Sequence, residues 1–566
     1  MQTVKPVIYQ LLPRLFTNYC AAPIVGGSIQ QNGSGKLNDI SDHILNSIKN
    51  LGATHIWYTG VIEHAHTPDY SAYGIAPHNC HIVKGKAGSP YAITDYYDID
   101  PDLAVDVPHR MAEFEALVER THRAGLNVII DFVPNHVGRQ YHSDAKPAGV
   151  DDFGSNDNTN VFFAPDNNFY YITYQQFSPD LDLGSGDEAY VEFPAKASGN
   201  DCFYASPGKD DWYETVKLNY GIDYSNGATH FSPMPDTWVK MIEILKFWAS
   251  KGIDGFRCDM AHMVPLEFWR TAIDAVRSVA PNIKFIAEIY DVALYRPFIE
   301  SGFDYLYDKV NLYDTLRAVE TNRAPASAIT GCWQAVDGIN DHMLNFLENH
   351  DEQRFASSFY SGDAMHVLPS LVVSALMSRG PMMIYFGQEL GEPGADAEGY
   401  SGYDGRTTIF DYWSVASVRR WLNEGCCDGY LSDNEKALRD IYSRVLRLCN
   451  DEQAISRGGF FDLMYVNYYN ARFNPYRHYA FLRHYGDTVL VIIANFDNID
   501  CDIAVNIPSH AFECLQIGEI TDNAAIEMLS ATKAYKELSP LRPFEAFVPA
   551  HGAVIWKLKT IKHTNS

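Results

Sequence analysis

The sequence predicts an α/β fold, a (β/α)8 TIM barrel with an irregular insert after its third strand and a C-terminal antiparallel β domain. Three observations support this prediction. Short apolar segments alternate with helical segments up to about residue 450, eight of the apolar segments have the character of strands, and several of them end in polar or acidic residues. The alternation implies a parallel sheet, and polar strand ends are typical of a barrel whose active site lies at that end.

The first part of the chain contains three strand candidates and two helix candidates. Strands are predicted over 7–16, 55–62 and 127–136. Helical spacing marks 37–52, which ends at a glycine, and 108–124, which begins with a proline. Glycine is common just after a helix and proline is common in its first turn. These segments therefore form β-α-β units.

The alternation stops between about residues 137 and 232. This stretch is rich in Asn, Asp, Gly, Pro, Tyr and Phe and has no long helical pattern. It is too long for an ordinary loop. We expect an inserted, irregular subdomain close to the mouth of the active site.

The second part of the barrel resumes with a helix at about 236–251. Further strands are predicted at 252–259, 284–290, 303–309, 342–351 and 381–390, with helices near 265–280, 311–320 and 365–379. After about residue 450, strand-like runs predominate. We therefore expect a barrel formed by 1–136 and 233–452, an inserted subdomain over 137–232, and a C-terminal β-sandwich over 453–566.

The composition is that of a soluble globular protein, with 46% hydrophobic residues and 20% charged residues. The formal net charge of −27 results from 44 basic and 71 acidic residues. Such a surface repels phosphate backbones, so we expect no nucleic-acid partner. The charge is compatible with a neutral substrate or a bound cation, although its simplest role is to keep the protein soluble.

The ten cysteines form no CxxC pair, which argues against a cysteine-based zinc or redox motif. Free buried thiols are the expected state. The N-terminal segment lacks the charged, apolar and small-residue regions of a secretory leader. No run of about 18 apolar residues predicts a membrane helix. We expect a cytoplasmic location and no membrane partner.

Four short strings carry the chemistry: DFVPNH (131–136), GFRCDMAH (255–262), FIAEIY (285–290) and FLENHD (346–351). Three of them place Asp259, Glu288 and Asp351 at or near a strand end. Singly, each acid would be a helix cap or turn residue, because short motifs often match by accident. Together, converging carboxylates are what cleavage of a glycosidic bond needs.

In order and content, the four strings resemble the alpha-amylase family, glycoside hydrolase family 13, in the form of a cytoplasmic bacterial-type member. The resemblance implies a retaining mechanism with a covalent glycosyl-aspartate intermediate. It identifies Asp259 as the nucleophile, Glu288 as the general acid and base, and Asp351 as the carboxylate that binds sugar hydroxyls.

The same resemblance implies four substrate-binding residues. Arg257 lies two residues before Asp259, on the same strand face, and would orient it. His136 and His350 would hydrogen-bond the innermost sugar. Tyr91, in the segment 89–101, would stack on the sugar ring. Asp131 would support the arginine.

The resemblance leaves open whether the protein binds calcium. Asn135 matches a calcium-ligating asparagine, and Asp180, Asp182 and Asp223 are acidic candidates in the insert. However, Met263 stands where starch-cleaving members often have a histidine, which makes Asn135 a doubtful ligand. Asn135 could equally brace the insert by hydrogen bonds. No cofactor is expected to be required, and Ca2+ is one possibility.

Three functions follow from these features. The first is a retaining hydrolase of alpha-glucan oligosaccharides or a related alpha-glucoside. The second passes the glycosyl unit to a sugar or phosphate acceptor, for which Lys217 and Arg406 are basic candidates; segments 214–221 and 404–413 look more like those of maltosyltransferases. The third, an inactive sugar-binding or interaction barrel, is disfavoured because all three carboxylates are present.

Overall fold

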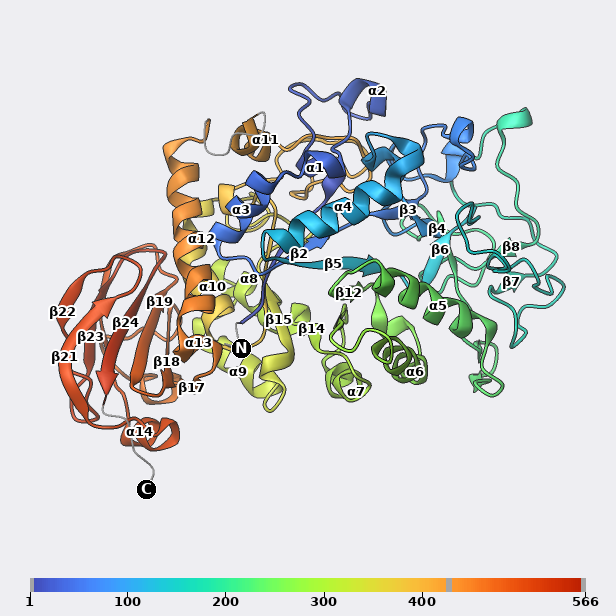
Figure 1. Ribbon diagram of the computed structural model, residues 1–566. Coiled ribbons are helices and arrows are strands. Elements are labelled where there is room, and N and C mark those ends of the chain that lie inside the picture. Colours follow the sequence, from blue (N-terminus) through green and yellow to red (C-terminus); the bar gives the residue numbers. More distant parts are fainter. Residues whose placement is uncertain (1–4, 424–429, 561–566) are drawn as a thin grey trace.

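The computed structural model describes residues 5–423 and 430–560, and its centre is a closed barrel of eight parallel strands (Figure 1). The first strand pairs with both the second and the last, at Tyr9 opposite Ile56 and Ile384, which closes the sheet. All eight predicted strand regions contribute to the barrel. The barrel strands are β1 (Val7–Leu11), β2 (His55–Tyr58), β5 (Asn127–Phe132), β12 (Gly255–Cys258), β13 (Lys284–Ala287), β14 (Tyr305–Tyr307), β15 (Met343–Phe346) and β16 (Met382–Tyr385).

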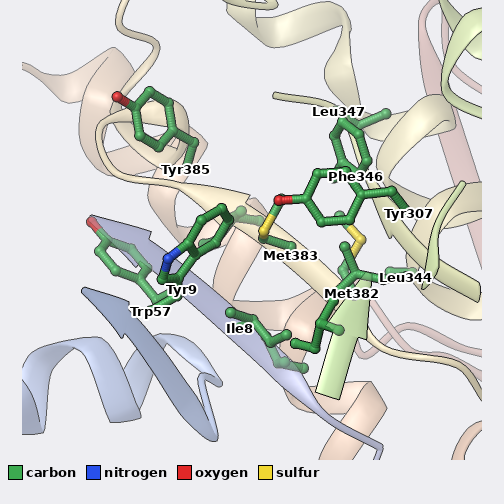
Figure 2. Close-up of a cluster of buried hydrophobic side chains, with 14 of the residues drawn as sticks. Ile8, Tyr9, Trp57, Tyr307, Leu344, Phe346, Leu347, Met382, Met383 and Tyr385 are labelled. Atoms are coloured by element: carbon green, nitrogen blue, oxygen red, sulfur yellow. The ribbon is translucent and has the colours of Figure 1, made fainter. Parts of the chain in front are cut away.

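Large side chains fill the barrel, so it is a packed core and not a pore. Figure 2 shows Ile8 and Tyr9 of β1 close to Met382 and Met383 of β16, with Trp57 of β2 beside them. All five are at most 2% exposed. Burial of this kind stabilises the fold by roughly 1.5–3 kcal/mol per large side chain.

Helices surround the barrel, and their ends follow the sequence signals. In α3 (Asp42–Leu51), the Ser41 hydroxyl accepts from the Ile44 N–H and Gly52 follows at φ 119°, as predicted for a helix ending at this glycine. The other helices of this part of the chain are α1 (Pro13–Phe16), α2 (Ile29–Asn32), α4 (Arg110–Arg123), α5 (Asp236–Ser250), α6 (Leu266–Arg277), α7 (Tyr295–Glu300), α8 (Asp314–Glu320), α9 (Ile329–Ala335), α10 (Leu368–Leu376), α11 (Ala416–Leu422) and α12 (Asp433–Asp451).

The first strand is shorter than predicted. Residues 7–16 were expected to be one strand, but β1 ends at Leu11 and the short helix α1 begins at Pro13. The ring of proline removes a backbone donor and fixes a φ that suits the first turn of a helix. An apolar run therefore continues through two different elements.

The segment 137–232 has no α-helix and contains only short strand pairs. It begins within β6 (His136–Gly138), which pairs antiparallel with β9 (Thr215–Lys217). A small apolar core that includes Tyr170 and Phe177 supports it. Figure 1 shows this insert at the opposite end of the molecule from the C-terminal sheet. The other short strands here are β7 (Tyr171–Ile172), β8 (Ala195–Lys196), β10 (Ile222–Asp223) and β11 (Ala228–Thr229), and β3 (Ile62–His64) pairs with β4 (Ile93–Ile99) nearby.

The C-terminal region is antiparallel, as expected. A six-stranded sheet in the order β17-β18-β19-β24-β21-β22 lies beside a two-stranded sheet, β20-β23, and α10 packs against β19 and β24 (Figure 1). The predicted limits of the three segments stay predictions. The elements are α13 (Gln453–Ser456), β17 (Gly459–Asp462), β18 (His478–Tyr485), β19 (Thr488–Asn495), β20 (Cys501–Val505), α14 (Ser509–Leu515), β21 (Ile520–Glu527), β22 (Lys533–Tyr535), β23 (Phe544–Val548) and β24 (Gly552–Thr560).

The eight cysteines within the described residues are free, but the expectation that they are buried is only partly right. Cys80 and Cys514 are exposed, because they lie in a surface turn and on a peripheral helix. Cys426 and Cys427 lie outside the described residues, as do residues 1–4 of the predicted barrel and residues 561–566 of the predicted C-terminal domain. Within those residues, none of the helices has the length and apolar character needed to cross a bilayer.

Candidate active site

A cleft of about 290 Å³ lies where the barrel strands end. Asp259 directly follows β12, Glu288 directly follows β13, and Asp351 lies in the loop after β15. Because parallel strands bring their carboxyl ends to one edge, residues distant in sequence meet there. Six of the predicted site residues line this cleft: Tyr91, His136, Asp259, Glu288, His350 and Asp351.

Arg257 lies beneath the cleft and is 1% exposed. Its Nη1 donates to Asp259 Oδ1 at 2.8 Å, and its Nη2 is 2.5 Å from Glu288 Oε1. On the neighbouring strand β5, Asp131 is in register with Arg257 and its Oδ1 lies 3.4 Å from Nη1. Asp131 also accepts from the Trp57 indole at 3.0 Å. Several groups therefore fix the guanidinium between the two carboxylates.

Glu288 is held by two further donors. The Met260 N–H donates to Oε2 at 2.8 Å and the Tyr290 hydroxyl donates to Oε1 at 2.6 Å. Tyr290 lies two residues after Glu288 in the string FIAEIY, so the alternation of side chains is a signal that could have identified it. With Arg257, these contacts leave the glutamate little freedom to change its orientation.

The carboxyls of the cleft lie close enough together to affect one another's ionisation. Burial raises the pKa of Asp259, and the nearby Glu288 charge raises it further, whereas Arg257 opposes the shift. Burial and Glu288 also raise the pKa of Asp351, although its side chain is 43% exposed and water moderates the shift. Closely placed carboxyls resist simultaneous ionisation, so the group retains a proton more readily than isolated acids do.

His350 is a neutral hydrogen-bonding group. Burial and then the Arg257 charge hold the pKa of His350 well below its usual range. Its Nδ1 is 2.8 Å from the Gln10 amide nitrogen, and its Nε2 is 2.6 Å from the Tyr91 hydroxyl and 3.1 Å from Asp351 Oδ2. With Gln10 as donor to Nδ1, the ring proton is on Nε2 and faces the Tyr91 hydroxyl and Asp351 Oδ2.

His136 is neutral as well, and aromatic side chains cover its side of the cleft. Burial, followed by the Lys217 charge, lowers the pKa of His136 to about 3. The Trp212 ring lies 5.2 Å from the His136 ring. Trp212 and Phe410 line the cleft, but both come from irregular segments without a sequence signal. Aromatic faces of this kind suit the apolar faces of sugar rings.

Tyr91, which is predicted to stack on a sugar, already contacts one of the two site histidines. Its ring stacks on His350, with centroids 5.2 Å apart and planes at 25°. The phenol is 8% exposed and lines the cleft. The same ring therefore supports His350 from one side, and its stacking role toward a sugar stays a prediction.

Asn135 faces a resident cation and does not fit a calcium site. The buried ammonium of Lys217 donates to the Asn135 side-chain oxygen, forms an ion pair with Asp201 at 2.7 Å and lies 3.4 Å from the Met263 carbonyl. A divalent ion sharing these oxygens would be repelled by the ammonium. Asn135 also donates to the Gly199 carbonyl at 2.7 Å, which braces the insert.

The acidic candidates of the insert do not complete such a site either. Asp182 accepts from the Gly184 N–H and Asp223 from Ser225, in local turns, and the Asp180 side chain is exposed. These turns satisfy the carboxylates within a few residues of chain, so no oxygen cage forms from them.

Lys217 and Arg406 differ in their access to a phosphate acceptor. Lys217 is 2% exposed and committed to the three oxygens around it. Arg406 is partly exposed, its Nε donates to the Asp351 carbonyl at 2.6 Å, and its Nη1 forms an ion pair with Asp404 at 2.9 Å. Only Arg406 of this pair therefore lies at the site with a solvent-accessible charge.

Comparison with known proteins gives the family of the chain. Residues 10–420 match the family model described as alpha amylase, catalytic domain. This chain belongs to the alpha-amylase family. Among curated relatives, alpha-amylase 3 of Dictyoglomus thermophilum is 23% identical over 65% of the chain and 62% of that protein. Neopullulanase 2 of Thermoactinomyces vulgaris is 24% identical over 69% of the chain and 57% of that protein. The chain thus spans about 60% of the length of both relatives.

Solved structures agree on the fold of this family member. A maltogenic alpha-amylase of Thermotoga neapolitana superposes with a TM-score of 0.61 at 18% identity, covering 99% of this chain and 100% of the other. An alpha-amylase of Geobacillus thermoleovorans, solved with acarbose, gives 0.62 at 18% identity, covering 98% of each chain. The predicted barrel and C-terminal antiparallel domain are confirmed.

Proposed function

We propose that this protein is a retaining glycosidase that cleaves alpha-glucan oligosaccharides or a related alpha-glucoside. One observation supports this proposal most strongly. The guanidinium of Arg257 contacts Asp259 and Glu288 on two different nitrogens, at 2.8 and 2.5 Å, beside a cleft with aromatic walls. Two closely placed carboxyls suit a nucleophile and an acid that flank one glycosidic bond.

In the first half of the reaction, Asp259 attacks the anomeric carbon. Glu288 donates its proton to the leaving glycosidic oxygen, and the bond between that oxygen and the anomeric carbon breaks. In the second half, Glu288 removes a proton from water, whose oxygen attacks the anomeric carbon and releases Asp259. Arg257 stabilises whichever carboxylate is charged at each stage.

The other cleft residues position the sugar. Asp351 and His350 both line the cleft, and His350 Nε2 lies 3.1 Å from Asp351 Oδ2, so the imidazole orients a carboxylate that can accept from sugar hydroxyls. His136 and Trp212 face the same space from the insert. Hydrogen bonds that strengthen as the ring flattens lower the barrier.

The relatives support the substrate class. An intracellular maltogenic amylase of Bacillus subtilis is 23% identical over 55% of this chain and 45% of that protein, and the relatives already described include an alpha-amylase and a neopullulanase. Their names support alpha-linked glucans as substrates here, and the intracellular relative supports a cytoplasmic location.

Glycosyl transfer is the second candidate. The apolar walls formed by Trp212 and Phe410 could hold an acceptor sugar and limit water, and the exposed charge of Arg406 could attract phosphate. Both reactions would share the intermediate on Asp259 and differ in what reaches it.

Incubation with maltooligosaccharides, trehalose, sucrose and isomaltose, with and without phosphate, tests these proposals. Hydrolysis gives free sugars, transfer gives longer or rearranged glycosides, and phosphorolysis gives sugar phosphates. NMR of the first-formed product should show the alpha anomer. A beta anomer at early times would contradict double displacement, and no turnover of any alpha-glucoside would contradict the function itself.

A further inference from the structure

Two histidines and a glutamate meet where the barrel contacts the C-terminal sheets. Glu320 is the last residue of α8, His366 lies in the 3-10 turn η12 (Ala364–Val367), and His551 lies in the turn between β23 and β24. One potential ligand atom from each lies within 4.8 Å of the other two. None of the three lines the catalytic cleft.

Two polar atoms of this cluster are not satisfied by the protein. Glu320 Oε2 and His551 Nδ1 are buried and have no hydrogen-bond partner. The side chain of Glu320 is only 2% exposed, and its Oε1 accepts from the Ser361 hydroxyl at 2.8 Å. A buried carboxylate oxygen without a partner costs free energy, so it indicates a missing ligand.

The spacing of the three side chains suits a shared ion better than direct contacts between them. Glu320 and His366 are 3.9 Å apart, which is too far for a good hydrogen bond. The nearby Arg477 is engaged by the backbone carbonyls of Val319 and Phe496.

We propose that Glu320, His366 and His551 bind a divalent transition-metal ion of the Zn2+ class, which ties the C-terminal sheets to the barrel. Two imidazoles and one carboxylate form a set that suits Zn2+ and not Ca2+. The two rings stack at 3.6 Å with planes at 10°, so each must rotate to direct a nitrogen at the shared ion. Asp363, 3.7 Å from His366 Nε2, is available to orient that ring.

The half-buried histidines make this movement and the entry of an ion possible. Since His551 belongs to the C-terminal strands and the other two belong to the barrel part, the metal would cross-link segments 185 to 231 residues apart in the chain. An ion that binds only the folded state stabilises it.

Calorimetric titration of the metal-depleted full chain with Zn2+ tests the proposal. One tight site is expected, with a higher thermal midpoint in the presence of Zn2+. His366→Ala and His551→Ala should each weaken binding by about 100-fold or more and remove the thermal shift. Glu320→Gln keeps the size of the side chain and should also weaken binding. Co2+ in place of Zn2+ should give visible absorption bands in the wild type, and these bands should be lost in the three site variants.

The matched control is His510→Ala. The exposed pair of His510 and Cys514, 3.0 Å apart, is another place where Zn2+ could bind. Binding and the thermal shift should survive in this variant. The proposal is wrong if the wild type binds no Zn2+, if the three site variants bind it normally, or if only His510→Ala loses it. Circular dichroism separates a folding defect from lost binding, and the Co2+ bands report ligation in any variant that folds.

Discussion

Arg257 joins the two central carboxylates of the cleft: its Nη1 lies 2.8 Å from Asp259 Oδ1 and its Nη2 lies 2.5 Å from Glu288 Oε1. A guanidinium offers two parallel donors in one plane, whereas an ammonium is a single point charge. Arg257 therefore contributes to both the distance and the relative orientation of the two acids.

Arg257→Lys should lower kcat by about 100-fold or more, because the charge remains but the two-pronged contact is lost. Steady-state kinetics on the best substrate of the panel measures this effect. Arg277→Lys is the matched control, since Arg277 pairs with Asp304 away from the cleft and should keep normal activity. Equal kcat values in both variants would contradict the role given to Arg257.

Asp259→Ala and Glu288→Gln should each reduce turnover by about 1,000-fold or more while the fold is preserved. Each change removes a group that forms or breaks a bond in the proposed reaction. Activity assays combined with circular dichroism provide the test. Turnover like that of the wild type in either folded variant would refute the assignment.

The sequence predicted the barrel and the acids well because both depend on local patterns. A strand ending in an acid is visible in a few residues, and parallel strands bring such ends together wherever they occur in the chain. Asp259, Glu288 and Asp351 could therefore be placed in one cleft. The predicted strand over 284–290 would also have placed Tyr290 on the same side as Glu288, because residues two apart share a strand face.

Contacts contributed by irregular segments were not predictable. Trp212 reaches His136 from a segment without periodicity, so nothing in its neighbourhood indicates a place in the cleft. From the sequence, Lys217 is a candidate phosphate ligand. Its contacts with Asp201 and Asn135 depend on the tertiary structure of the insert and could not be predicted. The helix α1 was missed because residues 7–16 form one apolar run, and hydrophobicity alone does not distinguish a strand from a helix.

The Lys217 ammonium makes calcium unnecessary beside Asn135. In the metal-depleted wild type, neither added Ca2+ nor the calcium chelator EGTA should change the thermal midpoint. Lys217→Met should lower the unfolding free energy by about 1–3 kcal/mol, because the Asn135 oxygen loses its donor in a buried position. Differential scanning calorimetry measures both effects.

Lys251→Met is the control for that change, since Lys251 forms an ion pair with Glu115 at the surface and should alter stability little. A clear rise in the thermal midpoint of the wild type on adding Ca2+ would show that the ion binds in spite of the lysine. Recovery of stability by Ca2+ in Lys217→Met alone would instead support the view that the ammonium takes the place of a metal.

Asp308 should make stability depend on pH. It is 3% exposed, accepts from the Leu312 N–H at 3.3 Å and has its pKa raised by burial to about 7. In the unfolded chain the same group has its ordinary pKa of 3.8. Between these values the folded state binds more protons than the unfolded state, so stability falls as pH rises.

Raising the pKa of Asp308 from 3.8 to about 7 corresponds to about 4 kcal/mol of unfolding free energy. This stabilisation is present at low pH and is lost once the pH exceeds the pKa of the folded state. Asp308→Asn keeps an acceptor for the Leu312 N–H but does not ionise. It should match the wild type near pH 4 and exceed it by up to about 4 kcal/mol near pH 8, as measured by urea unfolding. The exposed Asp274→Asn should leave the wild-type pH profile unchanged. Parallel profiles for Asp308→Asn and the wild type would mean that Asp308 is not held neutral by its burial.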